Sequence, residues 1–231
     1  MNKIAWIIFG AAVVLLIGGL VVYSRITNPG VDIGSTNINA FIGASDQNGQ
    51  IADHTIGSND SKVVLIEYGD FQCPSCGSAH PQVKALTDEY GDKILFIFRN
   101  LPLTSIHPNA RAAAGVAEAA GLQGKYWQMH DMIFENQDAW SSLDSTKRTE
   151  VFTTYAETLE LNKDQFLADL NSESVKKKIS FDESLFKETG FTKSTPTFVL
   201  DGTKVDDTVS SGLVQGDTTA LKALIDKALN Q

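Results

Sequence analysis

The chain contains little cysteine and no excess of positive charge. Cys73 and Cys76 are the only cysteines among its 231 residues, which excludes a multi-disulfide scaffold and a four-cysteine zinc site. Its 19 basic residues face 28 acidic ones, so the net charge of −9 gives nucleic-acid binding no electrostatic support. Apolar residues make up 42%, which excludes a mostly disordered chain. A globular protein of about one domain remains, with both cysteines close together in the sequence.

One stretch near the N-terminus carries no charge. A helix over residues 4–23 would be roughly 30 Å long, about the hydrocarbon thickness of a bilayer. A buried core helix and a cleaved signal peptide are the alternatives, but the stretch is uniformly apolar and a poor cleavage site follows it. We predict a signal anchor over residues 1–25 with a transmembrane helix over 4–23. The slight positive-inside bias of Lys3 against Arg25 favours a single-pass protein of the cell membrane with its catalytic domain on the extracytoplasmic side.

The remaining chain alternates between strand and helix patterns. Residues 26–50 are rich in small polar residues and predict a flexible tether. The apolar runs 63–66 and 94–98 predict buried strands, and the segment between them has helical spacing that ends at Gly91. Such a strand–helix–strand order is typical of a βαβ unit with parallel strands.

Helical patterns then continue to about residue 190, before the sheet resumes. Residues 197–200 predict a strand, Asp201 and Gly202 a hairpin turn, and the last residues a closing helix. The organisation predicted is an α/β domain interrupted by a helical insertion: residues 51–107 and 191–231 form the α/β part, and 108–190 the insertion.

The cysteines stand where the first strand meets its helix. In Cys73-Pro74-Ser75-Cys76, one helical turn brings the two sulfurs into bonding range, and the free N–H groups of that turn stabilise a thiolate at Cys73. Pro74 suits the first helical position. Half a zinc site or an inert bridge are alternatives, and His80 on the same helical face leaves open a Cys-Cys-His metal site. The strand–helix context favours redox chemistry, with Cys76 as the resolving thiol.

Four motifs in this order resemble the DsbA-like thioredoxin-fold thiol:disulfide oxidoreductases, and within them the membrane-anchored BdbD-type branch. The motifs are Glu67-Tyr68-Gly69-Asp70-Phe71-Gln72-Cys73-Pro74-Ser75-Cys76, Phe98-Arg99-Asn100-Leu101-Pro102-Leu103 with His107-Pro108, Gln123-Gly124-Lys125-Tyr126-Trp127-Gln128-Met129-His130-Asp131 and Thr195-Pro196-Thr197-Phe198. The resemblance implies a thioredoxin fold with an inserted helical domain, here preceded by the N-terminal transmembrane helix.

The resemblance also implies roles for particular residues. Cys73 matches the nucleophile, Cys76 the resolving cysteine, Pro196 a cis-proline that faces the disulfide, and Glu67 a buried acid near the resolving cysteine. Glu67 is expected to relay a proton to or from Cys76, and a paired structural charge is the alternative for it. The predicted substrate-binding residues are Thr195, Pro74 and Ser75.

Three neighbouring residues have less definite roles. Arg99 is either a counter-charge for Glu67 or a strand-end surface charge. His107 and His130 are interpreted as structural.

The function expected is disulfide donation outside the cytoplasm. Reduced client polypeptides would take up the Cys73–Cys76 disulfide, and a DsbB-like or vitamin K epoxide reductase-like, quinone-linked membrane protein would reoxidise the pair. No cofactor and no metal is expected. A reductase or isomerase on the same scaffold, and a copper carrier that uses the two cysteines, are the alternatives.

Overall fold

The computed structural model describes residues 6, 9–15 and 31–231, and divides the chain into two compact units, Met1–Val31 and Asp32–Gln231. In the first unit residues 9–15 are helical. Most of the anchor predicted over residues 4–23 lies outside the described residues. Among the residues that are described, no helix is both long and apolar enough to cross a membrane.

The second unit is built on a five-stranded sheet with the strand order β1-β3-β2-β4-β5. β2 and β3 are parallel, and every other pair is antiparallel. The βαβ unit expected from the sequence is present, because α2 and the short 3-10 helix η1 connect the two parallel strands. The bounds are β1 His54–Gly57, β2 Val63–Gly69, α2 Pro74–Tyr90, η1 Gly91–Lys93, β3 Ile94–Asn100, β4 Thr197–Leu200 and β5 Thr203–Lys204.

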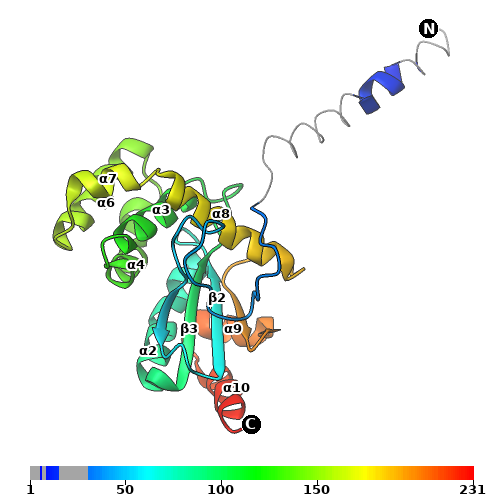
Figure 1. Ribbon diagram of the computed structural model, residues 1–231, viewed down its shortest axis with the longest axis vertical. Helices are drawn as coiled ribbons and strands as arrows, with labels where there is room; N and C mark the ends of the chain where they lie inside the picture. Colours follow the sequence, from blue (N-terminus) through cyan, green and yellow to red (C-terminus); the bar gives the residue numbers. More distant parts are fainter. Residues whose placement is uncertain (1–5, 7–8, 16–30) are drawn as a thin grey trace. The chain divides into compact units, whose positions relative to one another are not determined.

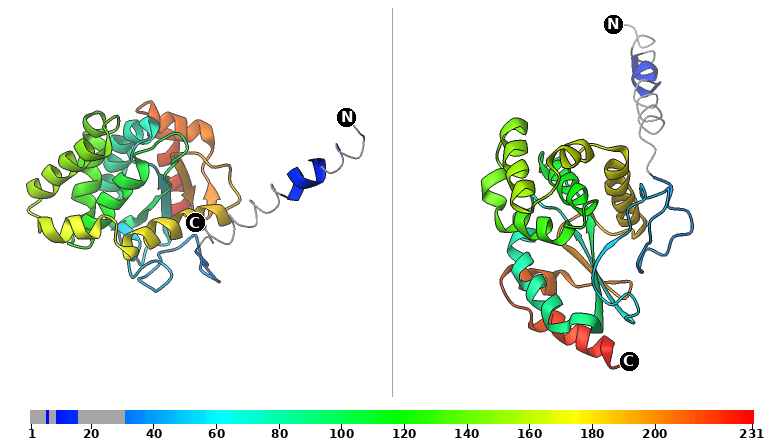
Figure 2. Two further views of the ribbon diagram at one scale, coloured as in Figure 1. Left: turned by 90° about the horizontal axis from the view of Figure 1, so that it is seen from above. Right: turned by 60° about the vertical axis from the view of Figure 1, so that its left-hand side comes forward.

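Six helices lie between β3 and β4 in the sequence, where the helical insertion is predicted. They are α3 Ala110–Gly121, α4 Tyr126–Glu135, α5 Gln137–Trp140, α6 Ser145–Thr158, α7 Lys163–Asp169 and α8 Glu173–Glu188. Side chains cap the last three, since Asp144, Asn162 and Ser172 accept hydrogen bonds from backbone N–H groups of the first turn. α9 (Asp207–Val214) and α10 (Thr219–Leu229) complete the chain. Figure 1 shows α3, α4, α6 and α7 gathered at one end of the sheet and α10 at the other, and Figure 2 agrees.

The segment before β1 differs from the flexible tether predicted over residues 26–50. It has no helix or strand from residue 31 onward, but the Arg99 guanidinium donates hydrogen bonds to the carbonyls of Ile38 and Ala40. Asn48 is fully buried, and Gly49 has a positive φ of 69° and lies against the backbone of Ser174, where a Cβ would collide. The described part of this segment is therefore bound to the body of the protein, because its carbonyls satisfy a buried cation.

A cluster of charges lies beneath that segment. Arg99 Nη2 is 2.8 Å from Asp53 Oδ2, and Lys178 Nζ is 3.0 Å from Asp53 Oδ1 and 2.7 Å from Asp182 Oδ1. All four side chains are fully buried. Burial would raise the pKa of Asp53, but Lys178 and Arg99 outweigh burial and lower it to about 2. Asp53 is thus the shared anion of two buried cations.

We expect the substitution Asp53→Ala to destabilise the protein by about 3–5 kcal/mol, because it leaves Arg99 and Lys178 buried without their shared partner. Urea unfolding measures this loss. The substitution Asp60→Ala, at an exposed aspartate, is the control and should change the free energy of unfolding by less than about 0.5 kcal/mol. Equal stability of the two variants would contradict the importance of the cluster.

Candidate active site

A turn that ends at Cys73 carries the chain from β2 into α2. The Cys73 N–H donates to the carbonyl of Asp70 at 3.0 Å. The Asp70 carboxylate accepts hydrogen bonds from the N–H groups of Gln72 and Leu103, both at 2.8 Å, and lies 2.7 Å from His107 Nδ1. His107 therefore has the structural place expected of it. Cys73 is the N-cap of α2 and Pro74 its first residue, as the sequence predicts.

The two thiols have different surroundings. Cys73 is 7% exposed and Cys76 fully buried, and both are free. The hydrogen bond from the Cys76 thiol, together with bonds from the backbone N–H groups of Cys76 and Ser75, lowers the pKa of Cys73 to about 5 despite its burial. Burial and the neighbouring Cys73 raise the pKa of Cys76 well above its ordinary value. At neutral pH the pair therefore holds one thiolate, at Cys73, and one thiol.

Glu67 lies in β2 within electrostatic range of both sulfurs. It is 4% exposed, and among the described residues it has no ion-pair partner within 4 Å. Burial and the charge of Cys73 raise the pKa of Glu67 to about 8. Its charge contributes in turn to the raised pKa of Cys76. Glu67 thus holds a proton at neutral pH beside the thiol that must gain or lose one during exchange.

Both roles left open for Arg99 are wrong, because it is neither the counter-charge of Glu67 nor a surface charge at a strand end. In the parallel pairing of β2 with β3, Glu67 lies opposite Phe98, and Tyr68 lies opposite Arg99. Since successive side chains of a strand point to opposite faces, Glu67 and Arg99 lie on different faces of the sheet. Arg99 is fully buried and pairs with Asp53 instead.

The loop before β4 meets the cysteines. The peptide bond between Thr195 and Pro196 is cis. Cys73 Sγ is 3.5 Å from the Thr195 carbonyl oxygen, 122 residues along the chain, and the Thr195 hydroxyl is buried without a hydrogen-bond partner. Thr197 Oγ1 donates to the carbonyl of Ser194 at 2.7 Å and closes the loop. The structure thus brings Thr195 and Pro196 to the thiols, where the sequence places them.

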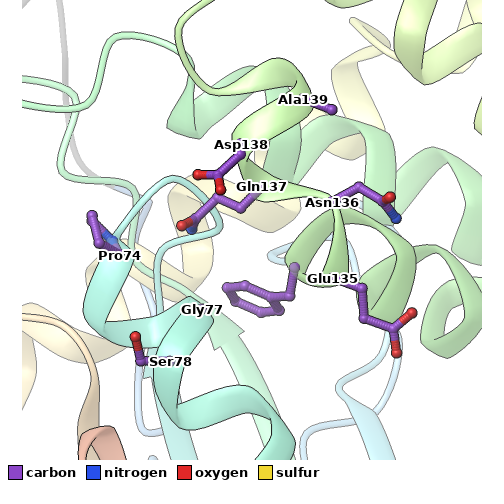
Figure 3. Close-up of a pocket in the computed structure, with 9 residues that line it drawn as sticks. Pro74, Gly77, Ser78, Glu135, Asn136, Gln137, Asp138 and Ala139 are labelled. Carbon is purple, nitrogen blue, oxygen red and sulfur yellow. The ribbon is translucent and has the colours of Figure 1, made fainter.

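Two hollows flank the start of α2. One, of about 290 Å³, is lined by Ser75, Thr195, Pro196 and residues of α9. The other, of about 510 Å³, lies between Pro74, Gly77 and Ser78 of α2 and the α4–α5 junction (Figure 3). Pro74 and Ser75, predicted to bind substrate, thus line different hollows.

Gln137 is a site residue that the sequence did not predict. Its side chain extends toward the first turn of α2, and its Nε2 donates to the carbonyls of Phe71 at 2.7 Å and Cys73 at 3.0 Å. No motif marks a lone glutamine of the insertion, and only the packing of α5 on this turn shows its role.

Comparison with known proteins places the chain in a family. Residues 50–223 match the family model described as Thioredoxin. A protein named Na(+)/H(+) antiporter NhaA 3, of Salinispora tropica, is 37% identical over 150 residues, which are 65% of this chain and 22% of that protein. Na(+)/H(+) antiporter NhaA 1 of Mycolicibacterium vanbaalenii is 43% identical over 93 residues, 39% of this chain and 15% of that protein. The chain spans about a fifth of the length of these curated relatives.

Solved structures share the fold. Oxidised BdbD of Bacillus subtilis has a TM-score of 0.64 at 20% identity, over 83% of this chain and 98% of that one. Alpha-DsbA1 of Wolbachia pipientis has a TM-score of 0.62 at 24% identity, over 77% of this chain and 91% of that one. A thioredoxin-like oxidoreductase of Silicibacter pomeroyi has a TM-score of 0.61 at 23% identity, over 78% of this chain and 93% of that one.

Since the family model covers more than half of its residues, the chain belongs to the thioredoxin family. Its cysteine pair, with one thiolate and one buried thiol at the start of α2, gives that fold the chemistry of a thiol:disulfide oxidoreductase. The enzyme class predicted from the sequence is confirmed.

The alkylation rate of the reduced protein by iodoacetamide should rise with pH around a midpoint near 5, because the Cys73 thiolate is the reacting species. Cys73→Ser should abolish this reaction. Cys76→Ala should move the midpoint upward, because it removes the strongest donor to the thiolate. A midpoint near 9 in the unmodified chain would contradict the thiolate assignment.

Glu67 should make the reduced protein less stable as the pH rises. Because its folded pKa of about 8 exceeds its ordinary 4.5, the unfolded chain ionises first, and stability falls between these two pH values. Glu67→Gln removes this fall. The difference in free energy of unfolding between the variant and the wild type should therefore shift in favour of the variant by about 4 kcal/mol from pH 5 to pH 8. Urea unfolding at both pH values measures this change. Glu150→Gln, an exposed change on α6, is the control, and a Glu67→Gln profile parallel to wild type would contradict the raised pKa.

Proposed function

We propose that the chain is a disulfide oxidase that donates the Cys73–Cys76 disulfide to reduced polypeptides. The stabilised thiolate of Cys73 carries the proposal. A group that favours the thiolate stabilises the reduced protein, and a stable reduced form makes the disulfide a stronger oxidant. DsbA and BdbD proteins have the same fold, so the scaffold is compatible with this chemistry.

The exchange begins when a client thiolate attacks Cys73 Sγ of the disulfide. The Cys73–Cys76 bond breaks and the electron pair goes to Cys76, whose raised pKa makes it take a proton. Glu67, protonated at neutral pH, is the nearby acid that supplies this proton. A second client thiolate then attacks the client sulfur of the mixed disulfide, and Cys73 leaves as a thiolate. The client gains a disulfide, and the pair is reduced by two electrons.

The client would lie across the start of α2. The hollows on its two sides give an extended chain room around Cys73, and the Thr195 backbone beside Cys73 offers a place for pairing with the client. Pro196 would shape the loop that holds Thr195 against the thiols.

The cellular setting belongs to the same proposal. We place the enzyme in the cell membrane through the apolar stretch 4–23, with the thioredoxin part on the extracytoplasmic side, as in the BdbD-type branch. A DsbB-like or vitamin K epoxide reductase-like membrane protein would reoxidise the pair. The acidic balance of the chain fits a domain with little attraction to anionic lipid.

Refolding of a reduced multi-thiol protein tests the proposal. The oxidised chain should restore client activity, whereas Cys73→Ala and Cys76→Ala should not, because neither variant can hold the disulfide that is donated. Equilibration with glutathione should give a potential above about −220 mV. A potential far below that value would overturn the oxidase direction and favour the reductase. Stoichiometric copper that is retained through Cys73, without disulfide exchange, would favour the carrier.

A further inference from the structure

Two histidines and a carboxylate meet between α2 and α4, outside the cysteine pair. His80 lies on α2, one turn beyond Cys76, and His130 and Asp131 are consecutive on α4. One ligand atom from each of the three lies within 4.8 Å of the others. His80 Nε2 is 3.6 Å from Asp131 Oδ1, and His130 Nδ1 is 3.2 Å from the same oxygen. The exchange mechanism uses none of these groups.

The imidazoles are buried without a full set of partners. His80 is 6% exposed and His130 4%, and the Nε2 atom of each has no hydrogen-bond partner. A buried nitrogen without a partner costs free energy, so native proteins rarely leave one unsatisfied. Burial also lowers the pKa of His80 to about 4 and that of His130, so both rings keep a free lone pair at neutral pH. His80 Nε2 is 3.6 Å from Asp131 Oδ1, which is too long for a hydrogen bond.

These spacings suit ligands of one small ion. Donors around a tetrahedral zinc ion at its usual bond lengths are about 3.4 Å apart. The two distances to Asp131 Oδ1, 3.6 and 3.2 Å, lie on either side of that value. A cavity of about 70 Å³ adjoins the three residues, which is room for an ion and one or two waters at about 30 Å³ each.

We propose that His80, His130 and Asp131 bind a divalent transition-metal ion of the zinc class, with water from the cavity in the fourth position. Two imidazoles and one carboxylate suit zinc and its neighbours and disfavour calcium or magnesium, which take oxygen ligands. Bound there, the ion would join α2, which carries the cysteines, to α4 of the helical insertion.

Binding would move one proton. His130 Nδ1 now faces the Asp131 carboxylate as a hydrogen-bond donor. An ion at that nitrogen takes the place of the proton, which moves to Nε2 of the same ring. Phe98 and Trp127 lie edge-to-face with this ring at centroid distances of 4.7 and 5.0 Å, so the ring that changes tautomer is enclosed by aromatic side chains.

Lys84 competes with the ion. Its ammonium group contacts Asp131 Oδ2, the oxygen next to the proposed ligand atom. Its side chain is 47% exposed and can therefore turn toward solvent. Substitution of this lysine by a neutral residue should strengthen metal binding, whereas a purely structural His–Asp cluster would show no such gain.

Titration of the oxidised full chain with Zn²⁺ tests the site, because the disulfide removes both thiols as ligands. We expect one ion per chain and a rise in melting temperature on binding. His80→Ala and Asp131→Asn should each weaken binding by more than about 100-fold, and Lys84→Gln should strengthen it by roughly tenfold. Asp88→Asn, which changes a carboxylate of the same cavity outside the cluster, is the matched control and should change it by less than about threefold.

The absorption spectrum of the Co²⁺-loaded protein is a second test of the site. The oxidised protein should give the intense bands of a tetrahedral site without thiolate charge transfer, and Asp131→Asn should abolish them. Circular dichroism confirms that each variant is folded. The proposal is overturned if no stoichiometric Zn²⁺ binds, if Asp131→Asn binds it like wild type, or if Lys84→Gln fails to strengthen it. Disulfide exchange in metal-free buffer tests the oxidase function separately.

Discussion

The buried charges of Arg99 and Lys178 determine which segments of this protein must meet. A cation in a dry interior is stable only with partners, and Asp53, Asp182 and the carbonyls of Ile38 and Ala40 provide them. Ile38, Ala40 and Asp53 all belong to the segment before β1, and Asp182 belongs to α8. Residues that look like a tether in the sequence are thereby bound to the sheet, and α8 is held across it.

This constraint leaves the opposite face of the sheet to the chemistry. Arg99 shares its face with Tyr68, whose ring contacts Phe186 of α8, while Glu67 and Phe98 point the other way, where Phe98 contacts Phe71 just before Cys73. Strand alternation thus keeps Glu67 and Arg99 on opposite faces of the sheet. Because no cation pairs with it among the described residues, burial dominates and Glu67 keeps its proton at neutral pH. A one-residue change in register would bring Arg99 to the face of Glu67, and the paired carboxyl would then be ionised at neutral pH.

The elements that carry the chemistry were predictable because their signals are local. The apolar run of β2, the cysteine pair and the helical spacing of α2 stand side by side in the sequence. β1 was not predicted, since His54–Gly57 is too short and mixed to show a period, and neither was α9, whose Ser and Gly residues resemble a loop. The partner of Arg99 could not be predicted either, because Asp53 lies 46 residues away and only the strand register decides between it and Glu67.

The proposed direction of exchange rests on the different surroundings of two thiols that lie one helical turn apart. Cys73 faces backbone N–H groups and the Cys76 thiol, whereas Cys76 faces the core and the acid of Glu67. A negative charge is therefore stable on the sulfur that clients reach and unstable on the sulfur behind it. In the reduced pair, the negative charge lies on Cys73, where the start of the helix stabilises it. The proton lies on Cys76, which the core keeps as a thiol. The stabilised thiolate of Cys73 favours the reduced pair, and this is the physical basis of the proposed oxidase direction.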